Sequence, residues 1–395
     1  MTGPEHTHRR AVERILEDAP LVTNRPFVIR RSPLVILAAI VLTLAQVACV
    51  CGGFDLGGSS TVKETVSGDW INVYFTGPRY PDDDAYHHGG LDEELASAIE
   101  QAEVSVDLAA YDFNLERVAD ALIAAHRDGI QVRVVVESDN AEEEETLDDL
   151  RQAGVPIVED GRSSGLMHNK FAIIDEQWVW TGSWNLTHNG TYRNNNNAVL
   201  IASTALAENY TAEFEEMFEG QFGPTSPADT PNPRVIITVK ISEGQGQQVE
   251  VENYFAPEDS VAAEIIAEIE KAQSRIRFMA FTFTSDEIAD AMLGRAGAGV
   301  IVQGVIESRN AERDYSEYPR LQRAVHDVLP DGNPYIMHHK VIIIDDATVI
   351  LGSYNFTGNA ESSNDENLLI IHDPEVAALF VEEFRRVYEQ ARTAD

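Results

Sequence analysis

Residues 166–187, LMHNKFAIIDEQWVWTGSWNLT, combine an apolar strand pattern with polar side chains that could carry out chemistry. A segment that only filled a core would have no use for an imidazole, an ammonium, a hydroxyl and an amide at regular spacing. Together these groups could bind an anion and transfer a proton. The polar members are His168, Lys170, Asp175, Ser183 and Asn185.

The same pattern returns later in the chain as IMHHKVIIIDDATVILGSYNFT, residues 336–357. His338 minus His168 gives a shift of 170, and this shift aligns every polar member of the two segments. A constant shift over such a distance indicates two halves of one ancestral unit. The repeated set is His338, Lys340, Asp345, Ser353 and Asn355.

The alternation of side chains along a strand places His168 and Lys170 on one face. Asp175 has the opposite parity, so we expect it to fix the turn, although Asp175 and Asp345 stay in the predicted catalytic set. Two halves related by a pseudo-twofold axis would bring both sets into one anion pocket. Two imidazoles there would suit phosphodiester cleavage, one attacking phosphorus and the other protonating the leaving oxygen. Lysines and asparagines supply the positive field, so no metal or other cofactor is predicted.

The pattern HxKxxxxD followed by GSxN resembles the HKD signature of the phospholipase D superfamily, in two complete copies. The resemblance covers the chain from about residue 71 to its end. It implies one active site formed by both motifs, a metal-independent enzyme and a covalent phosphohistidine intermediate. Carried onto this sequence, it assigns His168 as the nucleophile and His338 as the general acid.

The two halves differ at one position that bears on these roles. NNNNAVLI aligns with NDENLLII, so that Asn196 corresponds to Glu366. In proteins similar to this one, a Glu at this position hydrogen-bonds the HKD histidine. We therefore expect Glu366 to pair with His338, to raise its pKa and to keep it protonated, while His168 stays neutral.

The other polar residues of the motifs are expected to bind the substrate phosphate. They could instead be turn formers, because Gly-Ser-x-Asn is also good turn chemistry. The predicted phosphate ligands are Ser183, Asn185, Asn196, Ser353 and Asn355.

An insertion distinguishes the first half. YFTGP and YFAPE open the two halves 180 residues apart rather than 170, so about ten extra residues, close to RYPDDDAYHH, precede the first motif. Asp82, Asp83 and Asp84 with His87 and His88 would suit a metal site. A solvent-exposed loop, which could act as a lid, is the favoured interpretation.

Strand and helix signals alternate in each half, which predicts an α/β fold. Each half is expected to be a phospholipase D-like repeat with a mixed sheet flanked by helices. The two repeats would pack as a pseudo-twofold dimer within a monomeric chain. The predicted segments are a cytoplasmic segment 1–33, a transmembrane anchor or signal segment 34–51, a flexible tether 52–70, a first HKD domain 71–223, a linker with a possible strand 224–249 and a second HKD domain 250–395.

The apolar stretch LVILAAIVLTLAQVACVC at 34–51 is just long enough to span a bilayer. Arg25, Arg30 and Arg31 precede it, which predicts a cytoplasmic N-terminus and catalytic domains outside the cytoplasm. An uncleaved anchor, a lipoprotein signal ending at Cys49 and a cleaved signal peptide remain open.

The formal net charge of −37 bears on the substrate, because it would repel a polyanion unless a local basic site reversed the field. With the membrane segment, this favours hydrolysis of phospholipid head groups. A Nuc-like endonuclease acting on DNA or RNA by the same mechanism is the second hypothesis. A membrane module that binds phosphate without turnover is the third.

Overall fold

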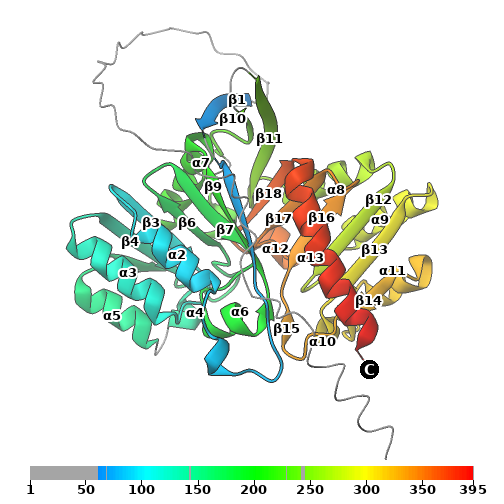
Figure 1. Cartoon of the computed structure of the whole chain (residues 1–395), viewed down its shortest axis with the longest axis horizontal. Helices are drawn as coiled ribbons and strands as arrows, with labels where there is room; N and C mark the ends of the chain where they lie inside the picture. Colours follow the sequence, from blue (N-terminus) through cyan, green and yellow to red (C-terminus); the bar gives the residue numbers. More distant parts are fainter. Residues whose placement is uncertain (1–60, 68, 142–143, 228, 242–244, 395) are drawn as a thin grey trace, which may run out of the picture.

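The structure is a computed structural model that describes residues 61–67, 69–141, 144–227, 229–241 and 245–394. Within them the chain forms two α/β halves that lie side by side (Figure 1). No described helix is both long and apolar enough to cross a bilayer. The predicted membrane or signal segment lies outside the described residues.

A mixed seven-stranded sheet forms the centre of the first half. In β6, Phe171 and Ile173 face the middle of the molecule, whereas Ala172 and Ile174 face the outer helices. Both faces are therefore buried, which explains the continuous apolar run after Lys170. In spatial order the strands are β2 (Ile71–Phe75), β9 (Asn197–Ala202), β7 (Trp178–Gly182), β6 (Lys170–Ile174), β3 (Ser105–Ala110), β4 (Gln131–Val136) and β5 (Ile157–Glu159).

The second half repeats this core within a nine-stranded sheet. Val341 and Ile343 of β16 face the middle of the molecule, and Ile342 and Ile344 face outward, as in β6. In spatial order the strands are β1 (Thr61–Ser67), β10 (Arg234–Ile241), β11 (Gln245–Ala256), β18 (Glu366–His372), β17 (Thr348–Gly352), β16 (Lys340–Ile344), β12 (Arg275–Ala280), β13 (Ile301–Ile306) and β14 (Val328–Pro330).

The extra strands of this sheet come from the predicted tether, where no strand was expected, and from the predicted linker, where a strand was expected. Residues 61–67 of the predicted tether form β1, which pairs in parallel with β10 over its whole length. The predicted linker contains β10 and the start of β11, which form an antiparallel hairpin. The chain therefore enters the fold at the edge of the second half's sheet before it builds the first half.

Helices cover both faces of each sheet, as predicted. The long helices α7 (Thr204–Phe218) and α13 (Pro374–Thr393) close the two halves and share one hydrophobic core with strands of both sheets. Tyr210 and Phe214 of α7 and Phe380 and Phe384 of α13 are buried in this central core. The outer helices are α2 (Leu91–Ile99), α3 (Glu116–Arg127) and α5 (Glu145–Ala153) in the first half and α8 (Val261–Lys271), α9 (Asp286–Gly297) and α11 (Tyr318–Val325) in the second.

Short elements join the two halves at the edge where the motifs begin. β15 (Ile336–Met337) of the second half pairs in parallel with β8 (Asn194–Asn195) of the first. Met167 makes the equivalent parallel bridge to Asp365. The remaining short helices are η1 (Asp84–Tyr86), α4 (Ser138–Ala141), α6 (His188–Tyr192), η2 (Gly223–Thr225), α10 (Ser308–Ala311) and α12 (Gly358–Ser362).

Candidate active site

Each motif histidine lies just before an interior strand of its own sheet, β6 or β16, and its backbone is hydrogen-bonded to the other half. The amide of His168 donates to the carbonyl of Asp365 at 3.0 Å, and the amide of His338 donates to the carbonyl of Asn195 at 2.9 Å. Because each backbone bonds to the residue just before position 366 or 196, each imidazole faces the side chain at that position in the other half.

The partners of the two histidines correct the predicted pairing. Nδ1 of His168 lies 2.7 Å from Oε2 of Glu366, whereas Nδ1 of His338 lies 2.9 Å from Oδ1 of Asn196. Glu366 therefore contacts His168 rather than His338. The carbonyl of Ser183 lies 3.0 Å from Nδ1 of His338 as well. In both rings, the hydrogen-bond acceptor beside Nδ1 favours the tautomer that carries its proton on Nδ1. Nε2 is then the nitrogen that faces the substrate.

The motif serines support these partners rather than the substrate. Oγ of Ser183 donates to Oδ1 of Asn196 at 2.9 Å, and Oγ of Ser353 donates to Oε2 of Glu366 at 2.7 Å. Both serine side chains are fully buried. Ser183, Ser353 and Asn196 were predicted to bind the phosphate. Their hydrogen bonds instead position the histidines and the Glu366 carboxylate.

The glycine of Gly-Ser-x-Asn makes this arrangement sterically possible. Gly182 has φ of +153°, and a Cβ at this residue would lie 2.3 Å from the carbonyl oxygen of Asn197. Gly352 has the same φ, and a Cβ there would lie 2.2 Å from the carbonyl oxygen of Asn367. Only glycine lets these strand ends approach so closely that the next serine reaches its partner.

The motif lysines are buried beside the histidines. Nζ of Lys170 donates to the carbonyl of His168 at 2.5 Å, and Nζ of Lys340 lies 3.1 Å from both the carbonyl and Nε2 of His338. Each ammonium also lies over an aromatic ring, Lys170 at 4.7 Å from Tyr111 and Lys340 at 4.9 Å from Phe281.

Sequence reasoning did not identify these two aromatic residues as part of the site. Tyr111 and Phe281 also pack edge-on against His168 and His338, each with 4.6 Å between ring centroids. A signal was available, because AAYDF and MAFTF align under the same shift as the motifs. Asn364 was missed too, and its Nδ2 donates to Oε1 of Glu366 at 3.1 Å.

Burial and mutual repulsion set the charges of the site. Burial lowers the pKa of both His168 and His338 well below the usual range, and the charges of Lys170 and Lys340 lower both further. Burial also lowers the pKa of Lys170 to about 7 and that of Lys340 well below its usual value. Burial raises the pKa of Glu366 to about 7, against the opposing charge of Lys170. A bound phosphodiester would offset the crowded cations and favour their charged forms.

Asn185 and Asn355 remain available to a ligand. Oδ1 of each is buried, and among the described residues it has no hydrogen-bond partner. A buried amide without a protein partner is costly unless something else satisfies it. This oxygen is an acceptor and cannot bind a phosphate oxygen, so the phosphate-binding role of the two asparagines stays a prediction that depends on their Nδ2 donors.

Asp175 and Asp345 lie at the far ends of β6 and β16 from the histidines. The Asp175 carboxylate accepts from the backbone amides of Glu103, Val104 and Ser105. Asp345 does the same with the amides of Gln273, Ser274 and Arg275, where β12 begins. Their φ angles of 56° and 53° place them in the left-handed region. Both therefore fix turns, as their parity suggested, and neither belongs to the catalytic set.

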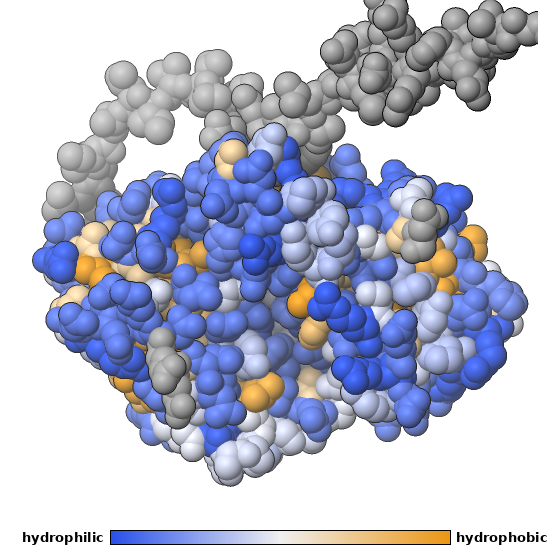
Figure 2. Space-filling model, turned by 90° about the horizontal axis from the view of Figure 1, so that it is seen from below, coloured by the Kyte–Doolittle hydropathy of each residue, from blue (hydrophilic) through white to orange (hydrophobic). Residues whose placement is uncertain are grey.

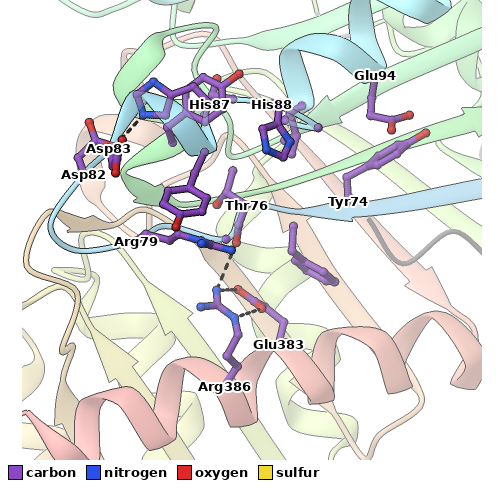
Figure 3. A pocket seen from close by; sticks show the side chains of 18 of the residues that line it. Tyr74, Thr76, Arg79, Asp82, Asp83, His87, His88, Glu94, Glu383 and Arg386 are labelled. Atoms are coloured by element: carbon purple, nitrogen blue, oxygen red, sulfur yellow. Dashed lines mark hydrogen bonds and ion pairs between the residues drawn. The ribbon is translucent and has the colours of Figure 1, made fainter. Parts of the chain in front are cut away.

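A separate cavity of about 350 Å³ lies beside the site, between the insertion of the first half and α13 (Figure 3). Thr76 in its wall accepts from the amide of Asn196 at 2.7 Å, and Glu383 bonds to His339 at 2.9 Å. The motif histidines and lysines do not line this cavity. It lies behind the catalytic groups rather than among them.

Comparison with known proteins relates both halves to one family of domains. The family model described as "Cardiolipin synthase, PLD-like domain" matches residues 95–218 and again 265–388. A phospholipase D of Rickettsia conorii is 36% identical over 132 residues, which cover 33% of this chain and 66% of that protein. A mitochondrial cardiolipin hydrolase of Xenopus tropicalis is 34% identical over 127 residues, 32% of this chain and 60% of that protein. The alignment thus spans less than two thirds of each relative.

A solved structure agrees with the two-halved fold. The phosphatidylserine synthase of Haemophilus influenzae superposes with a TM-score of 0.56 at 13% identity, over 77% of this chain and 84% of that one. At this identity the likeness concerns the fold alone. It covers both halves rather than one motif.

Proposed function

This chain belongs to the phospholipase D-like family, whose model matches both halves, and we propose that it hydrolyses phospholipid head-group phosphodiesters. The relatives are phosphodiester hydrolases, named phospholipase D and cardiolipin hydrolase. The observation that carries the proposal is the bond between His168 and Glu366 across the two halves, opposite the His338–Asn196 pair. It supplies two imidazoles with different partners around one anion pocket.

In the first step, Nε2 of His168 attacks phosphorus and forms a P–N bond. The P–O bond to the leaving alcohol breaks, and His338, which is protonated on both ring nitrogens once the bound phosphodiester offsets the neighbouring cations, gives its Nε2 proton to that oxygen and becomes neutral. Glu366 holds the proton on Nδ1 of His168, so it orients the attacking nitrogen and stabilises the positive charge of the phosphohistidine.

In the second step, water attacks phosphorus, Nε2 of His338 accepts a proton from the water, and the P–N bond breaks. His168 returns to its neutral form and the phosphate monoester leaves. Lys170, Lys340 and the Nδ2 groups of Asn185 and Asn355 stabilise the non-bridging oxygens in both transition states. No step needs a metal ion, because the cationic and amide donors supply the field.

The charge of the chain supports a lipid rather than a nucleic acid. With a net charge of −37, an extended polyanion meets repulsion along its length, whereas a single phosphodiester needs only the buried cationic pocket. The face in Figure 2 is mainly hydrophilic, with scattered hydrophobic residues. We therefore propose that the head group enters the pocket and that residues 34–51, as an anchor or a signal segment, place the halves outside the cytoplasm at the membrane.

Two substrates assayed in parallel test this proposal. The full-length chain is incubated with mixed phospholipid vesicles and with single-stranded DNA, with and without EDTA, and His168→Asn serves as the blank. We expect release of head groups that is lost in the variant and retained in EDTA. DNA cleavage without lipid turnover, falling steeply with added salt, would instead assign the chain to the nuclease branch. Phosphate binding without turnover of either substrate would indicate a binding module.

A further inference from the structure

The insertion of the first half has a fold of its own. Between β2 and α2 it spans residues 76–90, whereas residues 257–260 make the equivalent connection in the second half. It contains η1, and its Asp82 amide donates to Oη of Tyr335 at 3.0 Å. The loop is largely exposed, as predicted, but only 13% of the His87 side chain is accessible.

Two imidazoles meet where this insertion contacts α6. Nδ1 of His87 lies 3.1 Å from Nε2 of His188, with 4.6 Å between the ring centroids. Oδ1 of Asp84 lies 3.4 Å from the same Nδ1. Nitrogen and carboxylate oxygen are the ligands that zinc takes in catalytic and mixed sites. Zn–N bonds of about 2.0–2.1 Å at tetrahedral angles separate neighbouring ligand atoms by about 3.3 Å. Both measured separations are close to this spacing.

We propose that the Nδ1 atom of His87, the Nε2 atom of His188 and the carboxylate of Asp84 bind one zinc ion, with water completing the tetrahedron. The Asp84 side chain is 97% exposed, and rotation about its side-chain bonds would bring its carboxylate to both rings. The site lies at the histidine pair, outside the catalytic pocket, and it does not rest on the proposed function.

The far side of His87 is arranged as in many histidine–metal sites. Its Nε2 lies 2.7 Å from Oδ1 of Asp82, and the other oxygen of Asp82 accepts from Nε of Arg193 at 2.7 Å. A carboxylate on the outer nitrogen fixes the tautomer that leaves the inner nitrogen free for a metal. Figure 3 shows His87 and Asp82 joined on the loop, away from Glu383 and Arg386 of α13.

A metal here would fasten the insertion to the first half beside the catalytic motif. His188 follows the Gly-Ser-x-Asn turn of that motif by three residues, and Tyr335, which binds Asp82, precedes His338 by three. The zinc site would thus fix a loop that touches the segments leading to both catalytic sets. Its effect on catalysis would be indirect, through position.

Metal titration of matched variants tests the site. The full-length chain carries Cys49→Ser and Cys51→Ser in every sample, so that thiols do not bind the probe. Zinc content after dialysis and zinc affinity by calorimetry are compared for the parent, His87→Ala, His188→Ala, Asp84→Asn and His88→Ala. His88 is the matched control, because it is adjacent to His87 and solvent-exposed but has no contact with His188.

We expect the parent and His88→Ala to hold one more zinc ion per chain than His87→Ala and His188→Ala. Asp84→Asn removes an exposed ligand without disturbing the fold, so it should weaken binding while the melting temperature of the metal-free protein stays the same. Asp82→Asn should weaken binding about 10- to 100-fold. Equal zinc content in all variants would overturn the proposal, and it would leave the histidine contact as a simple hydrogen bond.

Discussion

The two halves of the molecule share one scaffold but differ in the residue that each gives to the other's histidine. The aromatic contact, the buried lysine, the serine behind the partner and the turn aspartate recur with nearly equal distances. The first half contributes the neutral Asn196 to His338, and the second contributes the carboxylate Glu366 to His168. Duplication supplied two equivalent imidazoles, and one change between amide and carboxylate makes them unequal.

The lysines follow the same asymmetry. Nζ of Lys170 bonds to the carbonyl of His168, whereas Nζ of Lys340 also reaches Nε2 of His338. Nε2 of His168, the ring that contacts the Glu366 carboxylate, is therefore not bonded to the Lys170 ammonium. Nε2 of His338, the ring that contacts the Asn196 amide, faces the Lys340 ammonium, which is a proton donor. This difference favours His168 as the nucleophile and His338 as the group that exchanges protons.

The largest expected effect comes from removing either histidine. His168→Asn and His338→Asn should each lower kcat for a lipid substrate by about 10³-fold or more, because covalent attack and proton transfer are both lost. A nitrophenyl phosphodiester separates the roles, since its leaving group needs no proton. With this substrate, intact-protein mass spectrometry should detect a phosphoryl adduct on His338→Asn and none on His168→Asn. An adduct on His168→Asn would reverse the assignment.

Glu366→Gln removes the carboxylate and keeps the shape. We expect kcat to fall about 10- to 100-fold, as for other groups that orient a catalytic imidazole. Burial raises the pKa of Glu366 to about 7, so wild-type activity should fall as the pH drops below 7 and the carboxylate becomes protonated. The Gln variant should lack this acid limb in a pH–kcat profile. Glu258→Gln is the control, because burial also raises the pKa of Glu258 to about 7 but it contacts neither histidine. A persistent limb in Glu366→Gln would assign it to another group.

Exchanging Asn196 and Glu366 between the two halves should exchange the roles of the two histidines. Asn196→Glu with Glu366→Asn moves the carboxylate behind His338, on a scaffold that already holds a Glu at the equivalent place. We expect activity within about tenfold of Glu366→Gln alone, and peptide mapping should find the phosphoryl group on His338 instead of His168. The adduct on His168 in the double variant would show that position 196/366 does not select the nucleophile.

Sequence periodicity was enough to predict the α/β halves, the central motif strands and the closing helices, because each depends on local apolar spacing. It could not predict which half supplies each partner. Alignment shows that Asn196 and Glu366 are equivalent, but the crossing depends on backbone bonds between His168 and Asp365 and between His338 and Asn195, far apart in the chain. Local spacing could not predict β1 either, because its pairing partner β10 lies more than 160 residues away in the chain. It also explains the insertion, since Arg193 and Tyr335 hold Asp82.

The smallest expected effect concerns the feature in which the halves are alike. Asp175→Ala and Asp345→Ala each remove a carboxylate that accepts from three backbone amides, so each should lower the free energy of unfolding by about 2 kcal/mol. Urea denaturation measures this loss, and activity per folded molecule should be unchanged, because both residues lie away from the histidines.

The pH dependence of that loss follows from the same contacts. Burial alone would raise the pKa of Asp345, but the backbone amides of Arg275, Gln273 and Ser274 outweigh it and lower the pKa. A lowered pKa in the folded state means that the stabilisation is present above the unfolded value near 3.8 and is lost as the pH falls through the folded value. The stability difference between wild type and Asp345→Ala should therefore be constant at neutral pH and shrink in acid. A fall in activity per folded molecule would show that these carboxylates do more than fix the turns.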